Sequence, residues 1–379
     1  MLQTEILGDS LVRMGCEDFS GVPCSFLAPL FNYALNHGRF AMANNEGDAV
    51  ALASGISLAH LRSSPPRFGV VLLQNSGLCN ALSPLTSLNE PFAIPILGFV
   101  SLRGERDENG RNTDEPQHNI MGAITDKLLT LCEIESMFLT DEPSALESQL
   151  AHAQGVLRSG KSFFFIVRKA CLSPVALQQA PKQDSALPTR LAALARIQNL
   201  AQNRAVVLAT TGKTGRELYE LGDLQNQLYM VGSMGCVGTF GVGIAQKSSR
   251  KVIAIDGDGA ALMRLGALAM NAQIAREADA GNFCHILLDN QSHDSTGGQQ
   301  SLSPFVDFAA VARACGYAHA RLCANLEELA RELERFFAQS AGGAVFLALR
   351  IQKGSKKDLS RPKITPREVA ERLFGFLER

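Results

Sequence analysis

Short apolar runs alternate along this chain with longer stretches in which apolar residues recur at helical spacing. The helical pattern is clear over 47–61, 144–157, 187–199, 261–275 and 326–337, and the apolar runs cover 68–73, 94–101, 162–167, 205–209, 251–255, 283–288 and 344–350. Runs that are apolar throughout are typical of strands buried on both faces, and strands separated by helices pair in parallel. The alternation therefore predicts an α/β fold in which mostly parallel sheets are covered by helices.

A proline-containing segment divides the pattern into two halves. Residues 171–188 carry Pro174, Pro181 and Pro188 and show no periodic apolar pattern, which predicts a linker. The 379 residues, 46% of them hydrophobic, suffice for two domains with full cores. We expect one α/β domain at 1–170, the linker at 171–188, and a second α/β domain at 189–379. A site built on such sheets lies at the carboxyl ends of their strands.

Composition argues against several classes of function. The net charge is −1, tryptophan is absent and aromatic residues make up 6%, so we expect no nucleic-acid partner. The nine cysteines are dispersed without a CxxC pair, which argues against a structural zinc site and predicts reduced thiols in a cytoplasmic protein. Residues 1–19 predict an amphipathic helix rather than a signal peptide, and no apolar run is long enough to cross a membrane.

The string AIDGDGAALM places a tight turn between a strand and a helix. Gly257 and Gly259 let the backbone approach a bound group closely. A helix that begins near Ala260 offers free amide protons and its positive dipole end to a phosphate. Asp258 in the turn supplies a carboxylate for a magnesium ion that bridges two phosphates. Taken alone, this string is more often an ordinary glycine-rich turn.

A second string, LLDNQSHDSTGGQ, follows the next strand. Asn290 offers an amide oxygen, and the backbone carbonyl of Ser292 would complete the protein ligands of the metal. Gly297 and Gly298 would let the loop fold over the diphosphate. The two strings together are far more specific than either one and predict a magnesium–diphosphate site. A dinucleotide or nucleoside triphosphate site is disfavoured because the chain has neither GxGxxG nor a Walker motif.

A lone acidic residue lies where the pattern of the first half changes from strand to helix. Glu46, in NNEGDAVALASG, would most often be explained as a helix cap. The sharper interpretation is that it activates thiamine diphosphate, whose aminopyrimidine is tautomerised by a hydrogen-bonded carboxyl group before the cofactor reacts. In the second half, Gly232 could offer backbone groups to the pyrimidine. Met234 could support the ring from below, although a methionine there is more often a core residue.

Polar residues that follow strands of the first half are candidates for a substrate pocket. They are Gln74, Asn75 and Ser76 in LQNSG, Arg103 in SLRGE, and Gln117 and His118 in DEPQH. An arginine fork suits an oxyanion. His118 is also a catalytic candidate, because an imidazole can move a proton near neutral pH. Each residue alone is as often a loop-stabilising one, and their shared position after strands is what favours a pocket.

Longer strings extend these motifs in a fixed order from residue 21 to residue 300. They are GVPCSFLAPL, NNEGDAVALASG, LQNSGLCNALSPLTSLN, DEPQHNIMG, TTGKTGRELY, QLYMVGSMG, AIDGDGAALM and LLDNQSHDSTGGQ. With them the chain resembles the phosphonopyruvate decarboxylases, a group of two-domain thiamine diphosphate-dependent enzymes. The resemblance implies Glu46 as the cofactor activator and Asp258 and Asn290 as magnesium ligands. It also implies cofactor contacts at Thr211, Gly212, Gly232 and Met234, and it puts Ser25 in the substrate pocket.

The resemblance implies an activity and an assembly. The reaction is the removal of carbon dioxide from 3-phosphonopyruvate, which gives phosphonoacetaldehyde, in phosphonate biosynthesis. The assembly is a homodimer or a dimer of dimers, because in related enzymes the activating glutamate and the diphosphate motif come from different subunits. Arg103 and Lys213 are the candidates for phosphonate contact.

Three departures from the family pattern leave the substrate open. They are Cys24, Lys213 and the loop 104–115, all near the expected pocket. A decarboxylase of sulfopyruvate or another 2-keto acid therefore stays an alternative. So do a carboligase that condenses the substrate with an aldehyde and a non-catalytic cofactor-binding protein.

Overall fold

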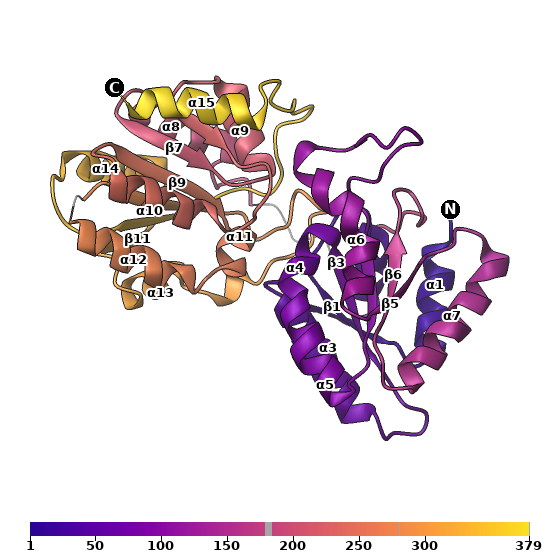
Figure 1. The fold of residues 1–379 in the computed structure, drawn as a ribbon. Helices are drawn as coiled ribbons and strands as arrows, with labels where there is room; N and C mark the ends of the chain where they lie inside the picture. The colour runs from indigo at the N-terminus through magenta and orange to yellow at the C-terminus, as the bar shows by residue number, and fades with distance from the viewer. Residues whose placement is uncertain (179–183, 280, 379) are drawn as a thin grey trace. The chain divides into compact units, whose positions relative to one another are not determined.

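The chain folds into two compact units, Met1–Ala180 and Pro181–Arg379 (Figure 1). The computed structural model describes residues 1–178, 184–279 and 281–378. Each unit contains one six-stranded sheet whose described strand pairs are all parallel. The predicted α/β fold with helix-covered parallel sheets is confirmed.

The sheet of unit 1 has the strand order β2-β1-β3-β4-β6-β5. Its strands are β1 (Asp18–Gly21), β2 (Phe40–Met42), β3 (Gly69–Gln74), β4 (Leu97–Ser101), β5 (Glu135–Phe138) and β6 (Phe163–Val167). The helices are α1 (Thr4–Arg13), α2 (Ala28–Asn36), α3 (Glu46–His60), α4 (Asn75–Pro84), α5 (Glu90–Phe92), α6 (Asn119–Leu131) and α7 (Pro143–Arg158). The π-helical turn η1 (Leu85–Asn89) and the 3-10 turn η2 (Pro116–His118) complete the unit.

Two apolar clusters lie on opposite faces of this sheet. On one face, Val70 and Leu72 pack with residues of α1, α2 and α7. On the other face, Val71 and Leu73 pack with residues of α3, α4 and α6. Successive residues of β3 thus enter different clusters, as the two-residue period of a strand requires. This burial on both faces is why the strands of the first half are apolar throughout.

The sheet of unit 2 has the strand order β11-β12-β10-β9-β7-β8. Its strands are β7 (Ala205–Ala209), β8 (Gln227–Tyr229), β9 (Lys251–Gly257), β10 (Phe283–Asp289), β11 (His319–Cys323) and β12 (Val345–Arg350). The helices before β10 are α8 (Arg190–Ala201), α9 (Lys213–Leu221), α10 (Val237–Lys247), α11 (Asp258–Met263) and α12 (Ala267–Ala278). The elements after β10 include η3 (Ser303–Phe305), α13 (Phe308–Ala314), α14 (Leu326–Ala338) and α15 (Pro366–Leu377).

The helices of unit 2 also divide between two faces. Residues of α10, α11, α12, α13 and α15 form one cluster with Val252 and Ala254 of β9. Residues of α8, α9 and α14 form the other with Ile253 and Ile255 of the same strand. The two sheets have the same strand order when β1–β6 are matched with β7–β12. In each sheet the order reverses between the first and third strand of the unit, which creates a crevice at the carboxyl ends there.

All seven predicted strands occur, with bounds shifted by up to three residues, and β7 coincides with the prediction. Five further strands, β1, β2, β5, β8 and β11, were not among the predicted runs. They are three to five residues long, and four of them lie at sheet edges. Such short strands, most of them at sheet edges, produce only short or interrupted apolar runs, which do not stand out in the sequence.

The helix predicted at 261–275 is two helices, so that prediction was wrong in detail. The first, α11, already begins at Asp258 rather than near Ala260. It ends because Arg264 leaves the helical region, at φ −130° and ψ 40°, and α12 starts after Gly266. Periodicity alone did not reveal this break because the buried residues on both sides keep a helical spacing.

The described parts of the predicted linker are hydrogen-bonded to the units. Residues 171–178 bind unit 1, and residues 184–188 bind unit 2. Leu2 donates from its backbone N–H to the carbonyl of Cys171 at 2.8 Å, and Asn32 Nδ2 donates to the carbonyl of Val175 at 2.8 Å. Near its end, the backbone N–H of Gln352 donates to the carbonyl of Pro188 at 2.8 Å. Residues 179–183 of the predicted linker lie outside the described residues.

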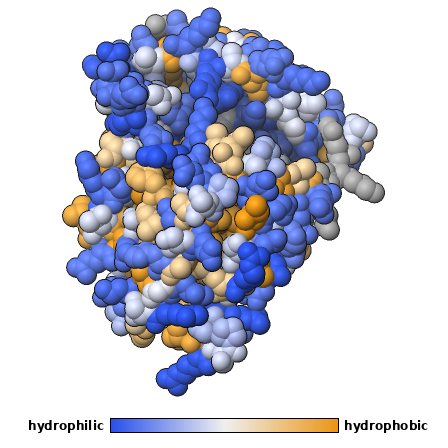
Figure 2. Space-filling view, turned by 90° about the vertical axis from the view of Figure 1, so that its right-hand side faces the viewer, coloured by the Kyte–Doolittle hydropathy of each residue, from blue (hydrophilic) through white to orange (hydrophobic). Residues whose placement is uncertain are grey.

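On the face drawn in Figure 2, hydrophobic residues are interspersed among hydrophilic ones. Such scattered apolar exposure is ordinary for a folded protein. All nine cysteines are free thiols. Over the described ranges, no helix is long and apolar enough to span a bilayer.

Candidate active site

The predicted diphosphate motif lies at the carboxyl ends of neighbouring strands in unit 2. Asp258 directly follows β9 and Asn290 directly follows β10, and these two strands are paired in parallel with Leu288 opposite Gly257. Thr211 and Gly212 follow β7, and Gly232 and Met234 follow β8. The motifs therefore gather around the crevice where the strand order reverses, between β7 and β9.

Asp258 is a buried carboxylate at the first turn of α11, only 3% exposed. The hydroxyl of Ser301 donates a hydrogen bond to its Oδ2 atom. Burial, together with the negative charge of Asp289, raises the pKa of Asp258 to about 7. Both causes disfavour the ionised form, so a cation bound at this carboxylate would stabilise it.

Asn290 is held from both ends of its side-chain amide. Its Nδ2 atom donates to Oδ2 of Asp294 at 2.5 Å, and its Oδ1 atom accepts from the backbone N–H of Ser292 at 3.2 Å. Asn290 is 4% exposed and Ser292 8% exposed. The loop then turns back through an antiparallel bridge between Ser292 and Gln300. It thereby returns to Ser301, the partner of Asp258.

The two glycines of the turn have different surroundings. A Cβ atom on Gly259 would lie 2.9 Å from Cε1 of His293 and 3.3 Å from Cε of Met234. Gly259, Met234 and His293 are therefore in close contact, which supports the placement of Met234 beside the motif. Gly257 has no atom within 4 Å of its Cβ position and has φ −103°, so its own fold does not demand glycine. The open space beside it is where a bound group could approach the backbone.

The loop after β7 meets the loop after β10. Gly212 has φ +89°, and a Cβ atom there would lie 2.7 Å from Oγ of Ser295. The positive φ requires glycine at this position, and the short distance to Ser295 shows that the two loops lie side by side. Thr211 and Gly232 are half-buried. Thus the predicted residues after β7, β9 and β10 are brought together, and Met234 after β8 joins them through Gly259.

The donor set fits a magnesium ion shared with a diphosphate. Nowhere in the described parts do three or more His, Cys, Asp or Glu side chains gather as a metal cluster. One carboxylate, one amide oxygen and one backbone carbonyl are instead what a hard cation takes from a protein when phosphate oxygens and water supply the rest. The N–H groups at the start of α11 add donors for the phosphates.

Glu46 begins α3 in unit 1 and is 5% exposed. The preceding Asn45 caps the helix by accepting from the backbone N–H of Asp48 at 3.0 Å. Glu46 is therefore not the capping residue, contrary to the commoner explanation for such a glutamate. Its Oε2 atom accepts from Asn80 Nδ2 at 2.8 Å, and a Cβ atom on Gly77 would lie 2.0 Å from its Oε1 atom. The carboxyl group is thus seated against α4.

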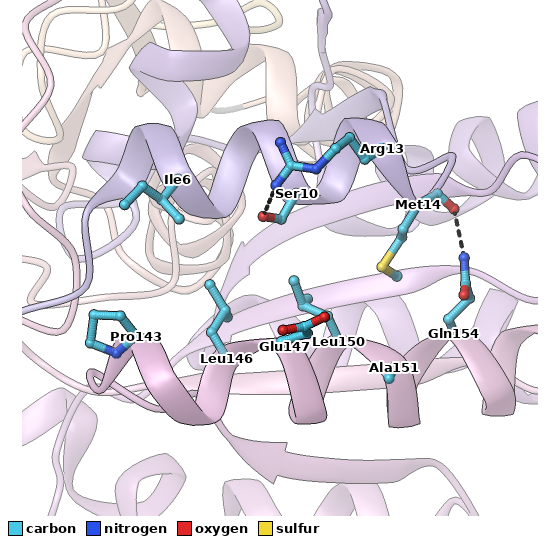
Figure 3. A pocket seen from close by; sticks show the side chains of 10 residues that line it. All are labelled: Ile6, Ser10, Arg13, Met14, Pro143, Leu146, Glu147, Leu150, Ala151 and Gln154. Carbon is cyan, nitrogen blue, oxygen red and sulfur yellow. Dashed lines mark hydrogen bonds between the residues drawn. The ribbon is translucent and has the colours of Figure 1, made fainter.

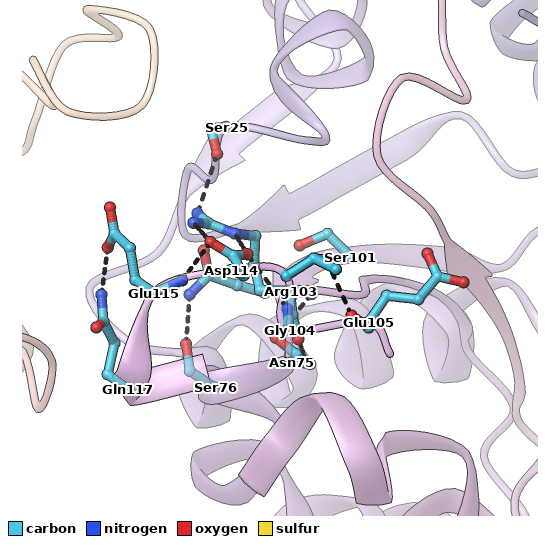
Figure 4. Close-up of polar contacts among 12 residues, drawn as sticks. Ser25, Asn75, Ser76, Ser101, Arg103, Gly104, Glu105, Asp114, Glu115 and Gln117 are labelled. Carbon is cyan, nitrogen blue, oxygen red and sulfur yellow. Dashed lines mark hydrogen bonds and ion pairs between the residues drawn. The ribbon is translucent and has the colours of Figure 1, made fainter. Parts of the chain in front are cut away.

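Arg103, the preferred candidate for anion binding, is engaged by an acidic partner from the loop 104–115. Its guanidinium donates to both carboxylate oxygens of Asp114, from Nε at 2.5 Å and from NH2 at 2.7 Å (Figure 4). It also lies 4.9 Å from the ring centre of Phe26 and donates to Oγ of Ser25 at 3.5 Å. The hydrogen bond from Arg103 is the main cause that lowers the pKa of Asp114 far below its ordinary value. The charge of Arg103 is therefore compensated within the chain.

The other predicted pocket residues surround this pair. Asn75 Nδ2 donates to the carbonyl of Arg103 at 2.8 Å, and Gln74 Nε2 donates to Oγ of Ser76 at 2.6 Å. Gln117 donates to a carboxylate oxygen of Glu115. His118 is buried, and its backbone carbonyl lies 2.1 Å from the Cβ position of Gly104. Asn75, Ser25 and Arg103 are thus linked to one another, whereas Gln74, Ser76 and Gln117 make local contacts.

A separate groove of about 520 Å³ lies between α1 and α7. Its lining residues extend toward one another from the two helices, with Arg13 donating to Oγ of Ser10 at 2.6 Å (Figure 3). None of the predicted site residues lines it. It is therefore separate from the strand-end motifs.

Several residues of the site carried no assigned role in the sequence. Asn80 and Gly77 shape the seat of Glu46, Asp114 binds Arg103, and Ser301 binds Asp258. His293, within the quoted HDSTGGQ string, contacts Gly259, and burial lowers its pKa to about 4. The strings contained these residues, but only the three-dimensional pairs show what they do.

Comparison with known proteins identifies the cofactor-binding domain and the family of the chain. Residues 211–349 match the model of the thiamine pyrophosphate enzyme C-terminal TPP binding domain. With two helix-covered parallel sheets and this domain, the protein is in the class of thiamine diphosphate-dependent decarboxylases. The chain is 39% identical to the phosphonopyruvate decarboxylase of Streptomyces hygroscopicus, across 97% of this chain and 92% of that protein. It is 38% identical to the phosphonopyruvate decarboxylase of Streptomyces viridochromogenes, across 97% and 93%.

The chain belongs to the phosphonopyruvate decarboxylase family, and the resemblance drawn from its motifs is confirmed. A more distant relative is the beta subunit of sulfopyruvate decarboxylase from Methanothermobacter thermautotrophicus. It is 32% identical across 49% of this chain and 93% of that protein.

Proposed function

We propose that this chain removes carbon dioxide from 3-phosphonopyruvate to give phosphonoacetaldehyde, with thiamine diphosphate and Mg²⁺, in phosphonate biosynthesis. The observation that carries the proposal is the identity of 38–39% with two phosphonopyruvate decarboxylases over 97% of the chain. The buried carboxyl of Glu46 and the Asp258–Asn290 pair supply the groups that this chemistry needs.

The residues divide the work between cofactor activation and cofactor binding. When bound, thiamine diphosphate supplies the electron sink that lets a 2-keto acid lose carbon dioxide. Asp258, the amide oxygen of Asn290 and the carbonyl of Ser292 would hold the magnesium ion. The carboxyl group of Glu46 would activate the cofactor by hydrogen bonding to its pyrimidine ring, and Asn80 fixes the orientation of that carboxyl group by a hydrogen bond at 2.8 Å. Met234 supports the cofactor, and His118 is the candidate for proton transfer at the substrate.

The direct test is carbon dioxide release from a panel of 2-keto acids. Purified protein with thiamine diphosphate and Mg²⁺ is given 3-phosphonopyruvate, sulfopyruvate and pyruvate, with Glu46→Gln as the matched variant of equal size. We expect 3-phosphonopyruvate to have the highest kcat/KM and Glu46→Gln to lose turnover while still binding the cofactor. Faster release from pyruvate, or an unaffected Glu46→Gln variant, contradicts the proposal. If an acyloin product forms when an aldehyde is added, the protein is instead a carboligase.

Sulfopyruvate is the second candidate substrate, and one contact favours it. Because Asp114 compensates Arg103, the pair presents less positive charge to the substrate than a free arginine would. A sulfonate carries one negative charge, whereas a fully ionised phosphonate carries two and needs a stronger cationic cradle. The ratio of kcat/KM for the two acids in the same panel decides between them.

We also propose that the protein works as a homodimer or a dimer of dimers in which Glu46 of one chain serves the diphosphate site of another. The relative from M. thermautotrophicus is named as a beta subunit, which supports assembly from more than one chain in that protein. The test mixes two inactive variants, Glu46→Gln and Asp258→Ala, after dissociation and reassociation. Random pairing would restore about a quarter of the wild-type activity, because half of the dimers are mixed and each has one intact site. No recovery from well-mixed dimers contradicts the shared site.

A further inference from the structure

Asp294 is a buried acceptor for three different segments of unit 2. Its Oδ2 atom accepts from Nδ2 of Asn290 at 2.5 Å, from NH2 of Arg190 at 2.7 Å and from the backbone N–H of Gly354 at 3.0 Å. The side chains of Asp294 and Arg190 are 10% and 6% exposed. Three donors on one oxygen of a buried carboxylate make a rigid junction, because hydrogen bonds to a charged acceptor are strong ones.

This junction determines which end of the Asn290 amide is available. The amide has a donor end and an acceptor end of nearly equal size. The donor end is committed to Asp294, and the acceptor end faces the backbone N–H of Ser292 at 3.2 Å. An amide oxygen has two lone pairs, so one stays available for a further partner. A metal ion needs that oxygen as a ligand. If the amide were turned by half a rotation, its NH2 group would face the metal ion and could not bind it.

Arg190 holds Asp294 in place through the hydrogen bond from its guanidinium at 2.7 Å. It begins α8, and its NH1 atom also donates to the carbonyl of Gly354 at 3.1 Å. A second buried acid, Glu217 of α9, lies 3.8 Å from NH1 and accepts from the backbone N–H of Lys356 at 2.8 Å. The segment 354–356, which follows β12, is thereby attached to the loop that carries Asn290. Arg190 and this segment lie outside the residues 211–349 that match the cofactor-binding domain.

We propose that Asp294 is the positioning residue of the metal site: braced by Arg190 and Gly354, it holds the amide of Asn290 with its oxygen toward the metal. This inference rests on the proposed function, in which Asn290 is a magnesium ligand. Partners that orient metal ligands typically change metal affinity by about 10- to 100-fold when they are removed. In this proposal Asp294 affects the site through Asn290. Its removal should therefore weaken metal binding even when no substrate is present.

The experiment measures Mn²⁺ binding in the presence of thiamine diphosphate by electron paramagnetic resonance, without any turnover. We expect Asp294→Ala to raise the Kd for Mn²⁺ by about 10- to 100-fold. Because this variant leaves a buried arginine without its main partner, Asp294→Ala/Arg190→Met is measured beside it to remove the uncompensated charge. The matched control is Asp223→Asn, because this aspartate of unit 2 pairs with Arg372 and Tyr229 and takes no part in the junction, and it keeps the wild-type Kd.

A reciprocal exchange separates orientation from a general structural role. Asn290→Asp alone places two carboxylates at the position of the 2.5 Å hydrogen bond. Adding Asp294→Asn restores that hydrogen bond with donor and acceptor reversed, so the double variant binds Mn²⁺ more tightly than Asn290→Asp.

Two results overturn this inference but leave the proposed function standing. One is a wild-type Kd for Mn²⁺ in both Asp294→Ala variants. The other is an equal Kd for Asn290→Asp with and without Asp294→Asn. A wild-type protein that binds no Mn²⁺ with thiamine diphosphate overturns the proposed function as well.

Discussion

The contact between Gly77 and Glu46 leads to a sharp prediction about cofactor activation. A Cβ atom on Gly77 would lie 2.0 Å from Oε1 and 2.3 Å from Cδ of Glu46, whereas ordinary contact begins at 3.4 Å. In Gly77→Ala the carboxyl group therefore has to retreat by more than about 1 Å, and a misplacement of about 1 Å at a reacting group can lower the rate about 100-fold. We expect kcat to fall about 100-fold while thiamine diphosphate and Mg²⁺ still bind, because the diphosphate motif lies in unit 2.

The assay is steady-state carbon dioxide release at saturating cofactor, with cofactor affinity and thermal unfolding measured on the same preparations. Gly155→Ala in α7 is the matched control, because it is also a helical glycine of unit 1 but has no atom within 4 Å of its Cβ position. It should keep full activity. The overpacked variant should lose about 1–3 kcal/mol of stability, which still permits folding.

Combination with Glu46→Gln tests whether the loss passes through Glu46. If Gly77→Ala acts by displacing that carboxyl group, it adds little to Glu46→Gln, because the two changes remove the same function. Full activity in a folded Gly77→Ala variant would refute the reasoning. Equal additional losses in both backgrounds would show that Gly77 acts by another route.

Three further predictions concern stability and cofactor binding. Asp114→Ala should lower the free energy of unfolding by about 1.5–3 kcal/mol at pH 7. Because the folded-state pKa of Asp114 is depressed, this difference from wild type is present above pH ~4 and shrinks as the pH falls below it, which urea unfolding at several pH values checks. Gly257→Ala should fold normally but bind thiamine diphosphate more weakly. Gly259→Ala should also lower the melting temperature, since only Gly259 contacts His293 and Met234. Titration calorimetry measures the cofactor affinity and scanning calorimetry the melting temperature. Saturation with cofactor and Mg²⁺ at 100 times Kd should stabilise the wild type by about 2.7 kcal/mol, and this gain should disappear after chelation by EDTA or in Asp258→Ala.

The central strands could be predicted from the sequence because they are buried on both faces and are therefore apolar at nearly every position. Residues 205–209 form β7 as predicted, since each one is buried between two layers of helices. The edge strand β2 was not among the predicted runs because its apolar residues 40–42 are partly exposed and the run is too short to assign by itself. The break between α11 and α12 was missed because Arg264 changes the backbone direction without interrupting the apolar spacing.

Motifs identified strand-end residues but could not identify the pairs they form. The strand-end positions of Asp258 and Asn290 were predictable, because a strand followed by a characteristic turn is a local signal; their role as metal ligands stays a prediction. The pairing of Arg103 with Asp114 was not predictable, because a loop that separates two residues by eleven positions can close in many ways. The motifs predicted that Arg103 binds the substrate anion, whereas in the structure its guanidinium binds the carboxylate of Asp114. Long-range pairs such as Ser301 with Asp258 depend on how the loops fold back.

The shared strand order of the two sheets has a consequence for the ancestry of the site. Matching β1–β6 with β7–β12 puts Asn75 of unit 1 in the place of Asp258 and Arg103 in the place of Asn290, each directly or nearly directly after its strand. Such correspondence is what duplication of one ancestral half-chain would leave once residue-level likeness had faded. The halves would then have specialised: one copy kept a carboxylate suited to a cation, and the other placed an amide at the same corner. That specialisation would explain why we propose a metal site at the corner of unit 2 and none at the equivalent corner of unit 1.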